Sequence, residues 1–350
     1  MQPVSTPAPW RKHAWTLARL GLAVALATVV AANVHAQDLV TLWRNLAWPW
    51  AAGAALSFWL VCLMMSLRVW QLLDRRVPVS ALLELTVIQT VTGNLIASSA
   101  GVASYIALLM GRYGITLGWS LWTVLLTRFA DGLVLLSCLA ITSAFLWGAI
   151  EPLHWPLTLL IGGLAIGALG LSLLFARRRQ VLQGTQRLLL ATGMERAPVV
   201  GNVIARLTET PYLSLHPTGS HAATQLAYSG AVMLAQFAYS YCSLRMFGVT
   251  LDPGVVLFVL TFNLLVAMVP IQILGGLGIV EVTSLYLYGL FGIGGDSLAP
   301  VLLSGRAAFY LINLVTLLYL PLGAWMRMTA ARRQVNGPAA EAPCGGPPPQ

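Results

Sequence analysis

Glycines interrupt two apolar segments that occupy corresponding positions in the two halves of the chain. The first covers residues 92–101 and the second covers residues 270–278. Each segment lies in a stretch that is too hydrophobic to leave a membrane and too broken to form one straight helix. Paired broken segments of this kind are typical of transporters whose binding site lies near the bilayer midplane.

The composition requires a membrane. Of the 350 residues, 58% are hydrophobic and only 9% are charged, whereas a soluble domain carries roughly 25% charged residues. Several apolar runs reach the length of about 20 residues that spans a bilayer, so we expect an all-α polytopic membrane protein with about six to eight transmembrane helices. The net charge of +9 comes from basic residues at predicted helix ends, which is a topology signal and does not indicate nucleic-acid binding.

The chain reads as one transmembrane domain over residues 16–326. It is flanked by a cytoplasmic tail at 1–15 and a disordered, Pro- and Gly-rich tail at 331–350. A basic cytoplasmic loop is expected at 177–221. The first apolar run, 16–34, is favoured as an uncleaved helix over a signal peptide. The remaining spans are predicted at about 49–73, 118–147, 155–176, 222–246, 254–269, 279–292 and 298–326.

Charge distribution predicts how the broken segments cross the membrane. If 80–111 crossed once, the basic cluster at 177–179 would lie outside, against the positive-inside rule. A re-entrant hairpin that turns back between Gly93 and Gly101 keeps this cluster in the cytoplasm; a single kinked helix is the alternative. With the hairpin, both termini are cytoplasmic and the protein lies in the bacterial inner membrane.

The second half repeats this plan upside down, so residues 49–147 and 222–326 are predicted to form an inverted repeat. Each repeat contains a helix, a broken hairpin and a second helix. Spacing supports the correspondence, because Arg128 follows Gly101 by 27 residues and Arg306 follows Gly278 by 28 residues. Two hairpins that enter from opposite faces would meet near the midplane.

Charged residues inside apolar spans are costly and usually face a cavity or a partner. Arg128 and Asp131 are three residues apart on one predicted helix, so they share a face and can pair. Glu281 follows the second glycine run, and Arg306 lies in the last span. Structural roles are also open: Arg128 and Asp131 as an ion pair that locks two helices, and Glu281 as a partner of the helix dipole. Glu84 is expected near the membrane interface.

Three segments carry a family resemblance. Residues 270–281 resemble the P-x-S-x-G-G-x-G-x-x-E signature of the lysylphosphatidylglycerol synthase transmembrane-region family, often called flippase-like. Residues 127–131 resemble its E-R-x-x-D segment, and residues 94–101 resemble its N-x-x-x-P-x-x-x-G stretch. The similarity covers about residues 50–326 and implies lipid translocation or export of a lipid-linked precursor. The chain departs from the family pattern at Thr127 and Gln272, and Tyr105 stands where relatives carry a basic residue.

These observations lead to an inner-membrane lipid flippase that moves a phospholipid or a polyprenyl-linked head group. Its partner is an anionic membrane lipid or lipid-linked precursor, with a homodimer or envelope-lipid enzymes as further possible partners. No cofactor, metal ion or catalytic residue is expected. The alternatives are a membrane-embedded lipid-modifying enzyme with Glu281 or Asp131 as general base, or a scaffold that recruits enzymes through 177–221. The expected substrate-binding residues are Asn94, Gly101, Arg128, Asp131, Pro270, Gly275, Gly276, Gly278, Glu281 and Arg306.

Overall fold

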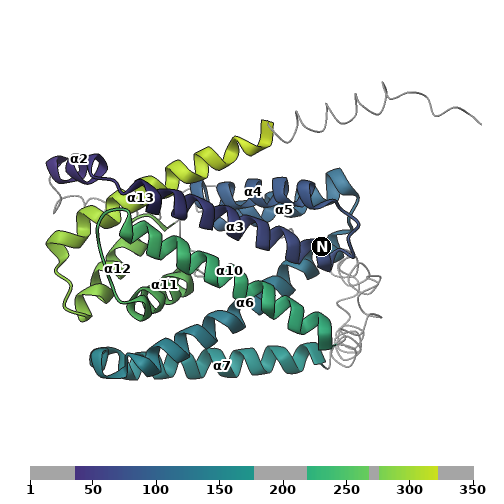
Figure 1. The fold of residues 1–350 in the computed structure, drawn as a ribbon. Coiled ribbons are helices and arrows are strands. Elements are labelled where there is room, and N and C mark those ends of the chain that lie inside the picture. The colour runs from purple at the N-terminus through teal and green to yellow at the C-terminus, as the bar shows by residue number, and fades with distance from the viewer. Residues whose placement is uncertain (1–35, 177–218, 268–275, 322–350) are drawn as a thin grey trace, which may run out of the picture.

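The computed structural model describes residues 36–176, 219–267 and 276–321, and every regular element within them is a helix (Figure 1). The predicted all-helical fold class is therefore confirmed. The first apolar run, almost all of the basic loop and the C-terminal tail lie outside the described residues. The elements are α2 (Ala36–Arg44), α3 (Trp48–Leu72), α4 (Val79–Leu95), α5 (Ser98–Tyr113), α6 (Leu117–Phe145), the short 3-10 helices η1 (Trp147–Ala149) and η2 (Glu151–Leu153), α7 (His154–Ala176), α10 (Gly219–Arg245), α11 (Pro253–Ala267), α12 (Ile279–Leu290) and α13 (Gly295–Leu317).

Four segments in the described residues are long and apolar enough to cross a membrane. They contain α3, α6, most of α7 and most of α13, and each lies close to a span predicted from the sequence. Helix α10 is also long, with 27 residues, but it is less apolar along its length. Together with the shorter apolar helices, these elements make the chain a multi-pass membrane protein.

Helices α3 and α10 form an antiparallel pair at the centre of the bundle. The ring of Trp50, near the start of α3, lies 6.1 Å from the ring of Tyr241, near the end of α10. Near the end of α3, Arg68 donates a hydrogen bond of 3.1 Å to Ser229 in the first half of α10. This pair supplies a common axis against which the other helices can be placed.

The first broken segment forms a helical hairpin. Helix α4 ends at Leu95, Ala97 is extended, and α5 begins at Ser98 and packs back along α4. At the open end of the hairpin, Arg112 of α5 donates to Glu84 of α4 at 3.0 Å. The break lies within the predicted turn region between Gly93 and Gly101, so a single kinked helix is excluded.

Gly101 allows the two legs of this hairpin to approach each other closely. A methyl group at Gly101 would lie 2.9 Å from the Cα atom of Gly93 and closer still to the carbonyl oxygen of Gln89. Real Cβ atoms do not make such short contacts with backbone. The glycine is therefore required by backbone packing near the tip, because any side chain here would push α5 away from α4.

The second broken segment also contains two antiparallel helices, α11 and α12. Asn263 of α11 donates to Ser284 of α12 at 2.8 Å. Nearer the other end, the ring of Phe258 lies 6.1 Å from that of Phe291, just after α12. Residues 268–275, which join the described parts of this segment, lie outside the described residues.

The two hairpins open at opposite ends of the α3–α10 pair. The first opens beside the end of α3, where the Trp119 indole donates to the carbonyl oxygen of Leu72 at 3.4 Å. The second opens beside the end of α10, where Ala47 donates to the carbonyl oxygen of Met246 at 3.0 Å. Figure 1 accordingly shows α4 and α5 towards one end of the bundle, and α11 and α12 towards the other.

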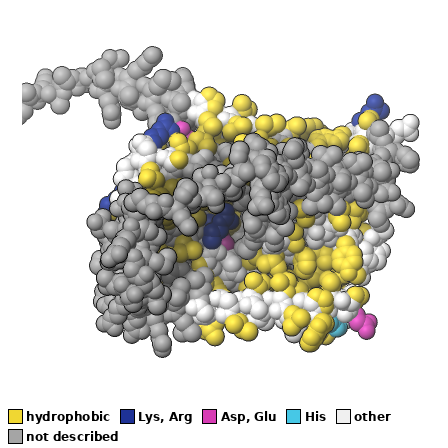
Figure 2. All heavy atoms as spheres, turned by 180° about the vertical axis from the view of Figure 1, so that it is seen from behind, with side chains coloured by type: hydrophobic (Ala, Val, Ile, Leu, Met, Phe, Trp, Pro, Cys, Tyr) yellow, Lys and Arg dark blue, Asp and Glu magenta, His cyan; other side chains and the backbone are white. Residues whose placement is uncertain are grey.

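The outer surface is largely apolar. Hydrophobic side chains cover much of the described part of the face in Figure 2, with a small group of basic and acidic side chains near its middle. Large exposed side chains occur on several helices, for example Leu56, Phe145 and Ile166. A soluble protein rarely exposes apolar area on this scale, whereas lipid tails cover it without cost.

Candidate functional site

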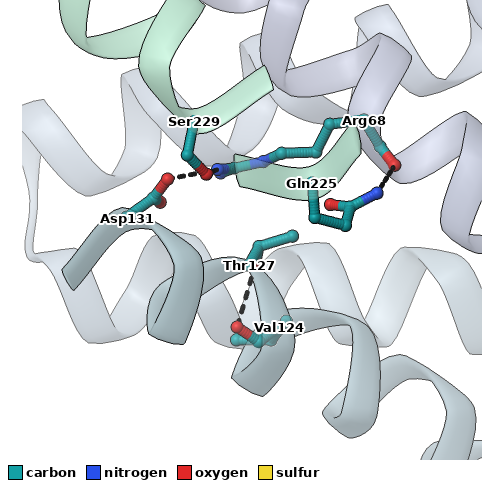
Figure 3. A network of polar contacts seen from close by, with 6 residues as sticks. All are labelled: Arg68, Val124, Thr127, Asp131, Gln225 and Ser229. Atoms are coloured by element: carbon teal, nitrogen blue, oxygen red, sulfur yellow. Dashed lines mark hydrogen bonds and ion pairs between the residues drawn. The ribbon is translucent and has the colours of Figure 1, made fainter. Parts of the chain in front are cut away.

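An ion pair between Arg68 and Asp131 joins three helices (Figure 3). Arg68 lies in α3 and is only 3% exposed. Its Nη1 atom donates to Oδ1 of Asp131 in α6 and to the hydroxyl oxygen of Ser229 in α10. The side-chain amide of Gln225, also in α10, donates to the carbonyl oxygen of Arg68 at 3.4 Å. The carboxylate therefore balances a buried cation that would otherwise be very costly in an apolar interior.

Arg128 does not pair with Asp131, so that predicted interaction is wrong. The two residues are three positions apart on α6, but the carboxylate is directed to Arg68. Arg128 is exposed and makes no hydrogen bond or ion pair with any described residue. The reason is competition: Arg68 is buried and needs the carboxylate more than an accessible arginine does.

Arg128 instead lines a small recess between α3, the first hairpin and α6. Arg68 forms part of the same lining, and so do Tyr105 of α5 and Gln89 of α4. Thr127 also lines the recess, and its hydroxyl donates to the carbonyl oxygen of Val124 at 2.9 Å, as Figure 3 shows. Two arginines from different helices thus meet in one recess within the membrane-spanning part.

A second ion pair lies in the other half of the chain. Arg306 of α13 donates through Nε to Oε1 of Glu281 at 2.6 Å, and both side chains are largely buried. The second carboxylate oxygen accepts a hydrogen bond of 2.6 Å from the backbone amide of Gly278. Glu281 therefore caps α12 at its N-terminus, which agrees with the structural role of a partner of the helix dipole. It also neutralises Arg306.

Glycines shape the chain just before α12. Gly276 and Gly278 have φ angles of 81° and 83°, in the left-handed region that favours glycine. Both are buried. Their conformation turns the chain into α12, and the amide of Gly278, just before the helix, donates to the Glu281 carboxylate. Of the other predicted site residues in this segment, Pro270 and Gly275 lie outside the described residues.

One hydrogen bond joins the tip region of the first hairpin to the second half. Asn94, near the end of α4, donates to the side-chain oxygen of Asn313 in α13 at 2.9 Å. Asn313 is fully buried and donates in turn to the carbonyl oxygen of Phe309 at 2.8 Å. Asn94 therefore contacts the other half directly, while Gly101 serves the packing of its own hairpin.

We expect Asn94→Ala and Asn313→Ala to be energetically coupled. Loss of the shared hydrogen bond predicts a coupling energy of about 0.5–1.5 kcal/mol in a double-mutant cycle. The measurement is the free energy of unfolding of the two single variants and the double variant in detergent micelles. Strictly additive effects would show that the two side chains do not interact.

Comparison with known families matches residues 16–316 to the family described as the lysylphosphatidylglycerol synthase TM region. The chain belongs to this family. No match was found among curated proteins or among solved structures. As a member of the lysylphosphatidylglycerol synthase TM region family, the protein is a membrane protein involved in lipid metabolism or transport.

The two charged residues of the segment that resembles the E-R-x-x-D motif of this family lie in different surroundings. Asp131 contacts the buried Arg68, while Arg128 lines the recess. Thr127, at the position of the motif's glutamate, brings no negative charge. This family member therefore has a more basic recess than a glutamate at position 127 would leave.

The sequence interpretation missed Arg68, which lies within the predicted span 49–73, as a site residue. It also missed Gln225 and Ser229, which lie in the first part of α10 and contact Arg68. The sequence signal that could have identified Arg68 was its charge, four positions before the end of an apolar helix. Ser229 carries no comparable signal, because serine is common where membrane helices pack closely.

Glu84 is less accessible than an interfacial residue would be. It is 6% exposed, and its partner Arg112 has a side chain that is 49% exposed. The pair therefore extends from the packed interior of the hairpin to its open end.

Within the described residues, no three His, Cys, Asp or Glu side chains are grouped as metal ligands would be.

Proposed function

We propose that the protein moves a lipid with an anionic head group between the two leaflets of the bacterial inner membrane. The observation that carries this proposal is the pair of helical hairpins. Helices α4 and α5 have 17 and 16 residues, and α11 and α12 have 15 and 12. At 1.5 Å per residue they are roughly 18–26 Å long, shorter than the hydrocarbon core of about 30 Å.

Hairpins of this length are re-entrant in our proposal: each enters the bilayer and returns to the face from which it came. Their opening at opposite ends of the α3–α10 pair supports entry from opposite faces. Irregular backbone at the tips is tolerated in a membrane only where protein or a polar cavity surrounds it. Near the tip of the first hairpin, Asn94 contacts Asn313 of α13. The turn residues Ile96, Ser98 and Ser99 are exposed, so in this proposal they line a polar cavity.

Helix packing supports an inverted repeat. Exchange of the two halves maps α3 onto α10, α4 onto α11, α5 onto α12 and α6 onto α13. Under this exchange, the packing of α4 against α13 corresponds to that of α11 against α6, and both contacts are present. The α3–α10 pair maps onto itself. Such repeats provide alternating access when one half rocks against the other.

Charge at the two ends of the bundle supports the proposed orientation. The end where the first hairpin opens carries the exposed residues Arg75 and Arg76 and the half-exposed Arg112. The opposite end carries two arginines, Arg44 and Arg245, so the described residues place more arginines at the first end. By the positive-inside rule, the first end is cytoplasmic.

The test is leaflet-resolved transport in proteoliposomes. Vesicles that contain fluorescent phosphatidylglycerol are treated with a reductant that bleaches only the outer leaflet. Wild-type protein should accelerate the loss of the protected signal over protein-free vesicles. Glu281→Gln weakens a charge-assisted contact worth about 1.5–3 kcal/mol, so we expect transport to slow roughly tenfold to a hundredfold. Glu151→Gln, which replaces an exposed acid on η2, is the matched control and should transport normally.

Two results would overturn the proposal. The first is wild-type protein that moves no lipid above the protein-free rate. The second is the appearance of a chemically new lipid in mass spectra of vesicles incubated with the protein, which would identify a lipid-modifying enzyme. An unchanged lipid that redistributes between leaflets supports translocation.

A further inference from the structure

We propose that the rings of Phe58, Tyr239 and Phe309 form a gate, which closes the recess between α3, the first hairpin and α6 off from the opposite end of the bundle. The gate rests on the proposed lipid translocation and adds a barrier to the path of the head group. Three observations carry it: the contacts of the three rings, their correspondence with the ion pair of Arg68 and Asp131, and the different exposure of two equivalent arginines.

The three rings contact one another where three helices meet. The ring of Phe58 in α3 lies 6.1 Å from that of Tyr239 in α10 and 6.3 Å from that of Phe309 in α13. The rings of Tyr239 and Phe309 are 6.2 Å apart. All three pairs have the edge-to-face arrangement that aromatic rings prefer. Because Phe58 belongs to the first half of the chain and the other two rings to the second, this aromatic cluster bridges the halves.

Helices α3 and α10 correspond residue by residue at this point. Arg68 of α3 and Tyr239 of α10 each follow the first residue of their helix by 20 positions. Phe58 of α3 and Ser229 of α10 each follow it by 10 positions. Exchange of the two halves therefore maps the contact of Arg68 with Ser229 onto that of Tyr239 with Phe58.

The third helix of each junction agrees with this correspondence. Asp131 of α6 and Phe309 of α13 each follow the first residue of their helix by 14 positions. One junction thus joins a cation, an anion and a hydroxyl, while its equivalent joins three aromatic rings. Water and a charged head group can pass along polar side chains, whereas a constriction of packed apolar side chains excludes both.

The two junctions also differ in how accessible their charged groups are. Arg128 of α6 and Arg306 of α13 each follow the first residue of their helix by 11 positions. Arg128 is exposed and lines the recess, whereas the side chain of Arg306 is 11% exposed. The guanidinium of Arg306 lies 5.4 Å from the ring centre of Phe309. The structure is therefore open at the polar junction and closed at the aromatic one.

The aromatic cluster lies between the recess and the end of the bundle where the second hairpin opens. Helix α3 begins at that end, and Phe58 lies about 15 Å along it, whereas Arg68 lies about 30 Å along it. A head group that leaves the recess along α3 towards this end must pass the cluster. Edge-to-face contacts are individually weak, so a rocking movement of one half can break them.

The test is the access of a water-soluble thiol reagent to the recess, which requires no transport. The full-length protein carries Arg128→Cys as the reporter, and its four native cysteines are replaced by alanine. Right-side-out and inside-out membrane vesicles are treated with a charged methanethiosulfonate. Two separate variants of the same background mark the ends of the bundle: Arg76→Cys at the end where the first hairpin opens, and Arg44→Cys at the other.

The reporter should react in the vesicles that expose Arg76→Cys and stay protected in those that expose Arg44→Cys. Addition of Phe58→Ala removes two ring contacts, so reaction from the protected side should become roughly tenfold to a hundredfold faster. Tyr239→Ala should act in the same direction. Tyr239→Phe keeps the ring and should leave the reporter protected.

Leu56→Ala is the matched control on α3. It truncates an apolar side chain two positions from Phe58, but this side chain is 72% exposed and lies outside the aromatic cluster. The reporter should therefore stay protected in this variant. Size-exclusion profiles of all variants establish that a gain of access is not a loss of fold.

Four outcomes would overturn the gate. They are equal reaction of the reporter from both sides with the rings intact, no reaction from either side, continued protection in a folded double variant Phe58→Ala/Tyr239→Ala, and the same gain of access in Leu56→Ala. The gate and the proposed function fail separately. One-sided access that depends on the rings without leaflet transfer refutes translocation alone, whereas leaflet transfer with access independent of the rings refutes the gate alone.

Discussion

Replacement of Asp131 by asparagine is expected to lower the free energy of unfolding by about 3–5 kcal/mol. The substitution keeps the shape of the side chain but removes the charge that balances Arg68. Because Arg68 is 3% exposed, its guanidinium cannot recover the lost interaction from water. Loss of one partner of a buried ion pair has costs in this range. Unfolding in detergent micelles, followed by circular dichroism over a denaturant series, gives the value.

Two comparisons make this result diagnostic. Arg128→Gln changes a charge one turn earlier on the same helix, but no described residue pairs with it, so its cost should stay within about 0.5 kcal/mol. The double variant Arg68→Met/Asp131→Leu removes both charges and should recover most of the stability. If Asp131→Asn were as stable as wild type, the ion pair would not hold these helices together.

Gly101→Ala is expected to destabilise the protein by about 1–3 kcal/mol and to separate the legs of the first hairpin. The added methyl group would lie 2.9 Å from the Cα atom of Gly93, and backbone cannot yield as a flexible side chain can. Thermal unfolding in detergent measures the loss. Limited proteolysis near residues 96–97 should show a more accessible hairpin tip.

Gly111 provides the matched control, because it lies on the same helix α5. A methyl group at Gly111 would meet no atom within 4 Å, and alanine favours a helix over glycine by up to about 1 kcal/mol. Gly111→Ala should therefore be neutral or stabilising. Equal losses at both positions would contradict a role for Gly101 in close backbone packing and would point to a general intolerance of the hairpin.

The broken segments were predictable because hydrophobicity and glycine placement act locally. The prediction of a break between Gly93 and Gly101 is confirmed, although the turn itself lies at Ile96 and Ala97, which are neither glycine nor proline. Gly101 has a different role from the one expected of it: it allows two helices to touch and does not itself turn the chain. A glycine in an apolar sequence indicates either a turn or a close approach of two helices, and the sequence alone does not distinguish these two roles.

The ionic partners were harder to predict because they depend on how distant helices pack. Asp131 and Arg128 are neighbours on one helix face, yet Asp131 contacts Arg68, which lies 63 positions away in the chain. Helix periodicity identifies which residues share a face, whereas the order of helices around α3 and α10 decides which face meets which. The pairing of Glu281 with Arg306 depends likewise on the approach of α12 to α13.

All three ion pairs in the described residues join elements of the same half of the chain. Between the halves, the polar contacts of Asn94 with Asn313 and of Arg68 with Ser229 use neutral acceptors, and the rings of Phe58 and Tyr239 pack against each other. The ion pairs therefore hold each half together internally, so the movement of one half against the other that alternating access would require would not separate these opposite charges in lipid.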